Sequence, residues 1–106
     1  INEMLLQSYE GVIRVFPNWN RGEDASFENL RAYGAFLVTS AFKQGEVQGV
    51  AILSEKGRIC KIENPWKGQP VQVTRGNKKS DILYGEYLQI PTAAGEKIEL
   101  NLYTNQ

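Results

Sequence analysis

The sequence contains no histidine and a single cysteine, Cys60. Without an imidazole, Ser-His-Asp and Cys-His catalysis are excluded, and one cysteine cannot replace the missing ligands of the usual zinc sites. One cysteine also excludes an intrachain disulfide. Cys60 lies among alternating apolar residues in GRICKIE, so we predict that it is a buried small hydrophobe. We therefore expect no metal site and no cofactor.

A strong charge of one sign is also lacking, because 12 lysines and arginines balance 12 aspartates and glutamates. Without a strong field, neither nucleic acid nor an anionic membrane is expected as a partner. The basic cluster at 75–79 is interrupted by Gly76 and Asn77 and is predicted to be a solvated turn. No run approaches the roughly 18 apolar residues of a membrane span, and no phosphate-binding, dinucleotide or calcium motif appears.

Catalysis by two carboxylates, as in glycoside hydrolysis, is formally left open by the 12 acidic residues. Most of them, however, alternate with apolar residues in predicted strands or lie in turns, as solvent-facing residues do. We therefore predict no catalytic residue and no activity for this chain alone.

The clearest structural signal is an alternating segment at 36–42, in which Phe36, Val38 and Phe42 share one face. The other face is partly apolar too, which is typical of a central strand. A turn at 43–46 and a second turn near Gly57 connect this segment to two further strands. These three consecutive strands are predicted to form an antiparallel meander.

The rest of the chain continues the same pattern. A loop is predicted at 64–70, short strands at 71–74 and 81–90 with a bulge or bend at Gly85, and a cleanly alternating last strand at 97–103. About seven or eight short strands predict an all-β fold, either an antiparallel sandwich or an open barrel.

The beginning of the chain departs from this pattern. Ile1, Met4 and Leu5 have the spacing of one helix face, and the break follows at Glu10 and Gly11. A helix over 1–9 is too short to be stable by itself. We therefore expect it to be part of something larger, and the β-domain to span 10–106.

Two tryptophans, Trp19 and Trp66, lie in predicted loops. Exposed indole rings stack on sugars, so one interpretation is a carbohydrate-binding module that uses this pair with Tyr33, or with Tyr84 or Tyr87. The other is that each ring folds back to close the core or packs on a neighbouring domain. The structural roles are favoured, because isolated aromatic residues are more often buried than displayed.

Two stretches, INEMLLQSYEGVIRVFPNW and FENLRAYGAFLVTSAFKQGEVQGVAILSEKG, resemble the C-terminal region of glycoside hydrolase family 95, the α-L-fucosidase-type enzymes. The resemblance covers about the first sixty residues and becomes vague beyond Trp66. The sequence departs from the family pattern at Tyr9, where the family commonly has His, and at NWNRGEDAS, which replaces an ALP-containing stretch. The matching positions are Glu3, Met4, Leu5, Leu6, Gln7, Ser8, Glu10, Gly11, Ile13, Pro17, Leu30, Arg31, Ala32, Gly34, Phe36, Val38, Gly45, Val47, Ala51, Ile52, Ser54 and Gly57.

The resemblance implies that 1–9 is the tail of the last helix of an (α/α)6 catalytic barrel and that 10–106 is an accessory β-sandwich domain. The family's catalytic residues lie in the barrel, so none is carried over to this chain. The implied partner is the upstream barrel of the same polypeptide, with glycans as a second candidate, and the parent enzyme is expected to be secreted or periplasmic.

Overall fold

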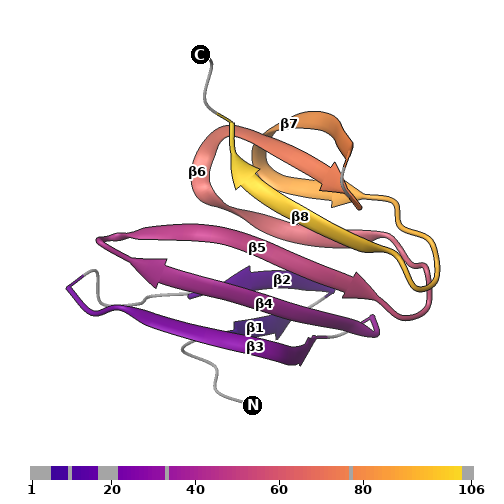
Figure 1. Cartoon of the computed structure of the whole chain (residues 1–106), viewed down its shortest axis with the longest axis horizontal. Helices are drawn as coiled ribbons and strands as arrows, with labels where there is room; N and C mark the ends of the chain where they lie inside the picture. Colours follow the sequence, from indigo (N-terminus) through magenta and orange to yellow (C-terminus); the bar gives the residue numbers. More distant parts are fainter. Residues whose placement is uncertain (1–5, 10, 17–21, 33, 77, 104–106) are drawn as a thin grey trace.

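The computed structural model describes residues 6–9, 11–16, 22–32, 34–76 and 78–103. Within these residues the backbone forms strands and turns but no helix, which confirms the predicted all-β class. The strands (Figure 1) are β1 (Leu6–Tyr9), β2 (Val12–Val15), β3 (Ala25–Ala32), β4 (Phe36–Lys43), β5 (Glu46–Ser54), β6 (Cys60–Arg75), β7 (Lys78–Ile90) and β8 (Lys97–Leu102).

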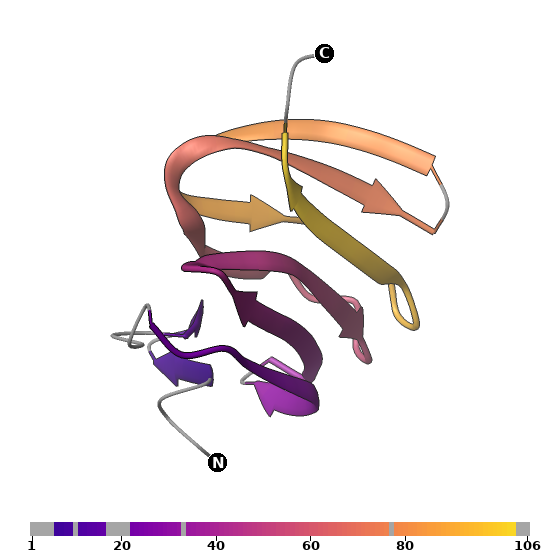
Figure 2. The ribbon, with the colours of Figure 1, turned by 60° about the vertical axis from the view of Figure 1, so that its left-hand side comes forward.

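The described strands form a single sheet that curves round on itself. Its order is β1-β2-β6-β8-β5-β4-β3, and β7 lies beside β6 off this path. Neighbours are antiparallel except β2 and β6, which run parallel with Ile13 opposite Ile62. β1 and β3 are the two ends of the order and contact each other, so the sheet is a nearly closed barrel, with its curvature visible in Figure 2. Of the two predicted architectures, the open barrel is the one that forms.

The core lies inside this curved sheet and is built by alternation along the strands. In β4, Phe36, Val38 and Phe42 are buried, and β4 lies between β3 and β5, as predicted for a central strand. The ring of Phe16 lies 5.4 Å from that of Phe27 and 5.6 Å from that of Phe42, measured between centroids. Burying each such side chain stabilises the fold by about 1.5–3 kcal/mol.

The predicted N-terminal helix is wrong where the structure describes it. Leu6–Tyr9 is the strand β1 and pairs antiparallel with β2, while residues 1–5 lie outside the described residues. Gly11, at φ 77°, allows the tight turn between the two strands. Leu6 is 1% exposed, so pairing with β2 buries a side chain that a lone short helix would leave without a core.

The predicted three-stranded meander is correct for β4 and β5 but wrong for β6. The turn at 43–46 joins β4 and β5 as a hairpin. β8, however, lies between β5 and β6 and pairs with both. In this position Ile98 and Leu100 of β8 are completely buried, which stabilises the fold. The short connection between β5 and β6, on which the meander prediction was based, gives no indication of this insertion.

The predicted loop at 64–70 is instead an irregular part of β6. The side chain of Asn64 stabilises the conformation of this irregular segment. Its Nδ2 donates hydrogen bonds to the carbonyls of Gln69 and Gly85, each at 2.9 Å. The Oδ1 atom accepts a 2.8 Å bond from the backbone N–H of Trp66. These side-chain bonds replace missing ladder bonds, so a Pro-containing segment stays within the strand.

The ladder between β6 and β7 is irregular opposite Gly85, but the bulge lies on β6 and not at Gly85, where a bulge or bend was predicted. Tyr87 and Gly85 of β7 face Glu63 and Gly68 of β6, so the additional residues belong to β6. A bulge of this kind bends the strand that carries the extra residues. The first part of β6 consequently pairs with β2, and the last part with β8.

Candidate functional site

Of the three predicted sugar-binding residues, Trp66 is the one that lies within the described residues. Its side chain is 8% exposed, and Nε1 donates a 2.9 Å hydrogen bond to the carbonyl of Val47. This is the arrangement of the alternative interpretation, in which the indole closes the core. Trp19 and Tyr33 lie outside the described residues, so their roles stay predictions.

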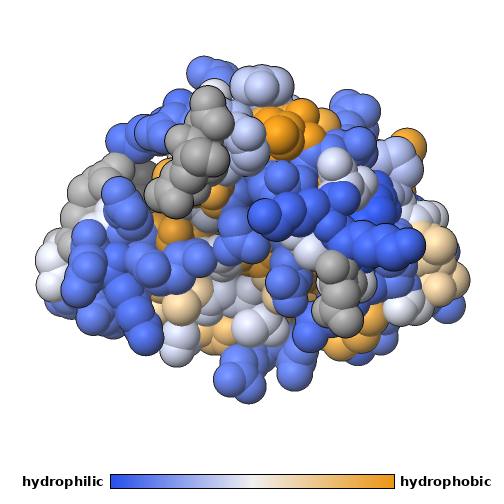
Figure 3. All heavy atoms as spheres, turned by 45° about the horizontal axis from the view of Figure 1, so that its top comes forward, coloured by the Kyte–Doolittle hydropathy of each residue, from blue (hydrophilic) through white to orange (hydrophobic). Residues whose placement is uncertain are grey.

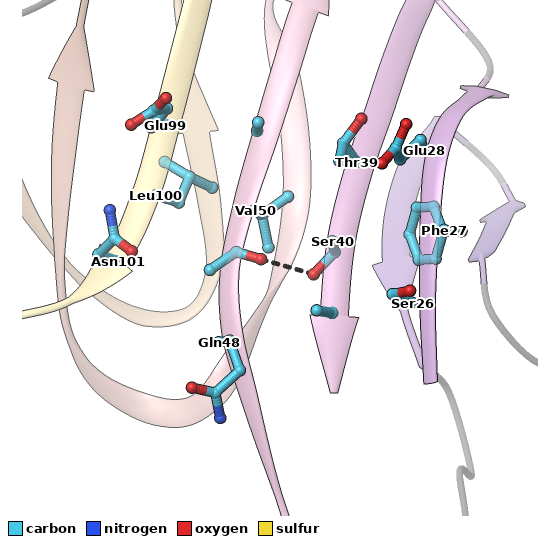
Figure 4. Close-up of a pocket in the computed structure, with 13 residues that line it drawn as sticks. Ser26, Phe27, Glu28, Thr39, Ser40, Gln48, Val50, Glu99, Leu100 and Asn101 are labelled. Carbon is cyan, nitrogen blue, oxygen red and sulfur yellow. Dashed lines mark hydrogen bonds between the residues drawn. The ribbon is translucent and has the colours of Figure 1, made fainter. Parts of the chain in front are cut away.

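A shallow groove of about 340 Å³ lies on the outer face of β3, β4, β5 and β8 (Figure 4). Its floor is made by small residues that face each other across the strands. Ala41 lies opposite Gly49, and Ala51 lies opposite Thr39. A Cβ atom at Gly49 would lie 2.8 Å from Oδ1 of Asn101, so glycine makes room for that side chain. Small residues therefore produce the hollow.

A bulge in β5 places Gly49 in the groove. Ala41 pairs with Gly49 but Phe42 pairs with Val47, which leaves Gln48 as the extra residue. The buried hydroxyl of Ser40 donates a 2.6 Å hydrogen bond to the carbonyl of Gly49, drawn as the dashed line in Figure 4. This bond fixes the bulge from the core side.

The rim of the groove is polar. The hydroxyl of Thr39 accepts a 3.0 Å bond from the backbone N–H of Asn29. The amide of Gln48 donates to the carbonyls of Lys43 and Glu46 and so belongs to the β4–β5 hairpin. Because the sequence has no histidine, the hydroxyls here lack an imidazole base. The polar lining residues are Ser26, Glu28, Thr39, Ser40, Gln48, Glu99 and Asn101.

An apolar strip continues beyond the groove on the same outer face. Leu37 lies opposite Leu53, and both are only partly buried. At the border, Arg31 pairs with Glu55 at 2.7 Å. The face presented in Figure 3, turned by 45° from the view of Figure 1, is covered mostly by hydrophilic residues, with hydrophobic ones in smaller areas between them. The strip and the groove together form what we call the outer face, defined by Leu37, Thr39, Ala41, Gly49, Ala51 and Leu53.

Cys60 is fully buried, as predicted, and burial raises its pKa to about 12. The protonated thiol packs as a small apolar group and is not a nucleophile. Within the described ranges, no group of three or more acidic, cysteine or histidine side chains is arranged to hold a metal ion. The part of the chain that the structure describes also contains no helix long and apolar enough to cross a membrane.

The sequence pattern pointed to part of this site. The apolar character of both faces at 36–42 predicts a central strand, and β4 does lie between β3 and β5, but the groove also needs β8 beside β5, which local pattern does not indicate. Comparison of the chain with models of known protein families and with curated proteins finds no match.

Proposed function

We propose that this chain is a non-catalytic accessory β-domain of a glycoside hydrolase similar to family 95, of the α-L-fucosidase type. Its outer face packs on the catalytic barrel and stabilises it. The observation that carries the proposal is the outer face itself: a strip of small and apolar side chains on strands whose inner side already forms the core.

The family resemblance supports the fold part of this proposal position by position. Among its matching residues, four glycines (Gly11, Gly34, Gly45 and Gly57) have positive φ, and the remaining matches on β4 and β5 are mostly inward side chains. Such residues specify strands, turns and core, and not chemistry. The resemblance thus argues for a shared scaffold. The buried matches on β3 to β5 are Ala32, Phe36, Val38, Val47, Ile52 and Ser54.

The geometry of the outer face supports docking. Ala41, Gly49 and Ala51 project little from the sheet, so another surface can approach the backbone closely there. Leu37 and Leu53 supply apolar area beside them, and the charged pair Arg31–Glu55 lies at the border. An apolar centre with a polar rim is the usual anatomy of a protein interface.

The coding region upstream of Ile1 provides the first test. A reading frame that continues into an (α/α)6 barrel with a DGNFG-like motif supports the proposal, and a native start at Ile1 contradicts it. The isolated chain should release no product from aryl α-L-fucosides, so clear turnover would also contradict it.

The second test is binding to that barrel, produced separately and followed by calorimetry. Ala51→Arg should abolish binding, because it puts a charge in the centre of the contact. Gln89→Arg, an exposed site on β7, is the matched control and should bind like the wild type. Equal affinity for both variants would show that the outer face is not the interface.

The alternative function is a carbohydrate-binding module that uses Trp19, Trp66 and Tyr33. The burial of Trp66 removes one of its three rings from the surface. Titration of the chain with glycans while tryptophan fluorescence is recorded tests this module: a response that Trp19→Ala removes supports it, and no response contradicts it.

A further inference from the structure

A polar cavity of about 390 Å³ is lined by residues of β6 and β7, two strands labelled in Figure 1. Its volume falls within the range of small-molecule sites. The lining residues are Glu63, Asn64, Lys67, Glu86 and Tyr87. The cavity thus combines one aromatic ring with carboxylate, amide and ammonium groups.

One wall of the cavity is held in place from β2. Nε of Arg14 donates a 2.9 Å hydrogen bond to Oε2 of Glu63. Hydrogen bonds to Glu63 first and to Tyr87 second raise the pKa of Arg14. The Glu63 carboxylate is therefore held by a cationic partner, which reduces the conformational freedom that a ligand would have to restrict.

The base of the cavity is rigid for a different reason. Asn64 is 5% exposed and uses both amide hydrogens on the carbonyls of Gln69 and Gly85. Its oxygen is occupied by the N–H of Trp66. Asn64 consequently shapes the cavity, and recognition is left to the other lining side chains.

The charges around the cavity balance. Two carboxylates, on Glu63 and Glu86, and one ammonium, on Lys67, line the cavity, and Arg14 pairs with Glu63 from β2. Within the described residues neither Lys67 nor Glu86 forms an ion pair, so both are available to a ligand. A balanced site favours an uncharged ligand, because a charged one would lose its hydration without a net opposite charge.

Tyr87 supplies the apolar element, because 53% of it is exposed beside these polar groups. A pyranose ring has hydroxyls that bond to carboxylates and ammonium groups, and a C–H face that packs on an aromatic ring. We infer that this cavity binds one sugar residue of a neutral glycan, with Tyr87 as the stacking ring and Glu63, Glu86 and Lys67 as hydrogen-bonding groups. The inference does not depend on the outer face.

The experiment is an NMR titration of the isotope-labelled 106-residue chain with D-galactose, L-fucose, D-xylose and cellobiose. Concentrations up to about 50 mM would fill a site of millimolar affinity. The amide signals of Glu63, Lys67, Glu86 and Tyr87 should move with at least one of these sugars. Tyr87→Ala should weaken binding about tenfold, while Tyr87→Phe, which keeps the ring, should stay within about threefold.

Tyr84→Ala is the matched control, because Tyr84 is 68% exposed on the same strand but does not line the cavity. It should bind as the wild type does, and an unchanged amide spectrum outside the cavity verifies that each variant is folded. The inference is overturned if no sugar shifts these amides, or if Tyr87→Ala binds equally well. It is also overturned if glucosamine or glucuronate binds more tightly than every neutral sugar.

Discussion

The indole of Trp66 and the carbonyl of Val47 are joined by a 2.9 Å hydrogen bond between strands that are not neighbours in the sheet. β8 separates β5 from β6, so this bond ties the bend of β6 to the start of β5 independently of the ladders. It explains how an irregular segment with two prolines stays packed. The ring closes the core at this end of the barrel.

Replacing Trp66 should therefore affect stability strongly. We expect Trp66→Ala to lower the free energy of unfolding by about 3–5 kcal/mol, because removal of the ring leaves a cavity in the core. Trp66→Phe should lose about 1–3 kcal/mol, since the carbonyl of Val47 then has no indole donor. Urea denaturation followed by circular dichroism measures both. Tyr84→Ala, at an exposed site, should stay within about 0.5 kcal/mol, and a similar small effect for Trp66→Ala would contradict the packing role.

The three hydrogen bonds of Asn64 provide a second prediction. Asn64→Ala should lose about 2–4 kcal/mol, because backbone groups of the bend lose their buried partners. Asn64→Asp should be at least as destabilised, since its carboxylate would face the carbonyls of Gln69 and Gly85. Thermal unfolding measures the change. Asn101→Ala, at an exposed position, is the control, and equal melting temperatures for the two alanine variants would refute the prediction.

A third prediction concerns the approach of the β5–β6 turn to the turn before β8. A Cβ atom at Gly57 would lie 2.7 Å from the backbone nitrogen of Ala94, and φ there is +75°. Gly57→Ala should lose about 2–4 kcal/mol from the clash and the left-handed backbone together. Gly95→Ala shares the positive φ but meets nothing within 4 Å, so it should lose only about 1–2 kcal/mol. Denaturant unfolding measures the free energy of unfolding of both variants, and the difference between the two values gives the cost of the clash.

The buried thiol of Cys60 predicts a pH dependence. Its pKa is raised from 9.0 to about 12 in the folded chain, so between these values the unfolded state binds fewer protons than the folded state. The contribution of Cys60 to the free energy of unfolding is fully present below pH 9.0. It decreases as the pH rises above that value, by at most about 1.4 kcal/mol per pH unit. Cys60→Ala should show a shallower loss over that window. Parallel stability curves for the two proteins would rule out this contribution.

Local alternation of hydrophobic residues correctly indicates most strands. The segments around Phe36 and Ile98 bury alternate side chains as expected. The helix prediction is wrong because Leu6 becomes buried when β1 pairs with β2. The spacing of apolar residues within nine positions contains no information on that tertiary contact. The loop prediction at 64–70 failed because side-chain bonds of Asn64 substitute for the ladder.

The sites were less predictable than the strands. The apolar character of both sides of β4 predicts a central strand and no groove, whereas Tyr84 and Tyr87, which are exposed on β7, are among the sugar-stacking candidates of the sequence. The pairing of Arg14 with Glu63, however, requires the parallel contact of β2 with β6, which joins residues 49 positions apart. No local pattern encodes such a contact.

Composition and alternation by themselves determined that the chain folds as strands with a buried thiol and no imidazole chemistry, because these properties depend on residue type and near neighbours. The tertiary structure alone decided that β8 separates β5 from β6, that Trp66 lies inside, and that a cavity forms beside Tyr87. Those outcomes depend on which distant strands bury the most apolar surface together, and that competition is settled only when the whole barrel closes.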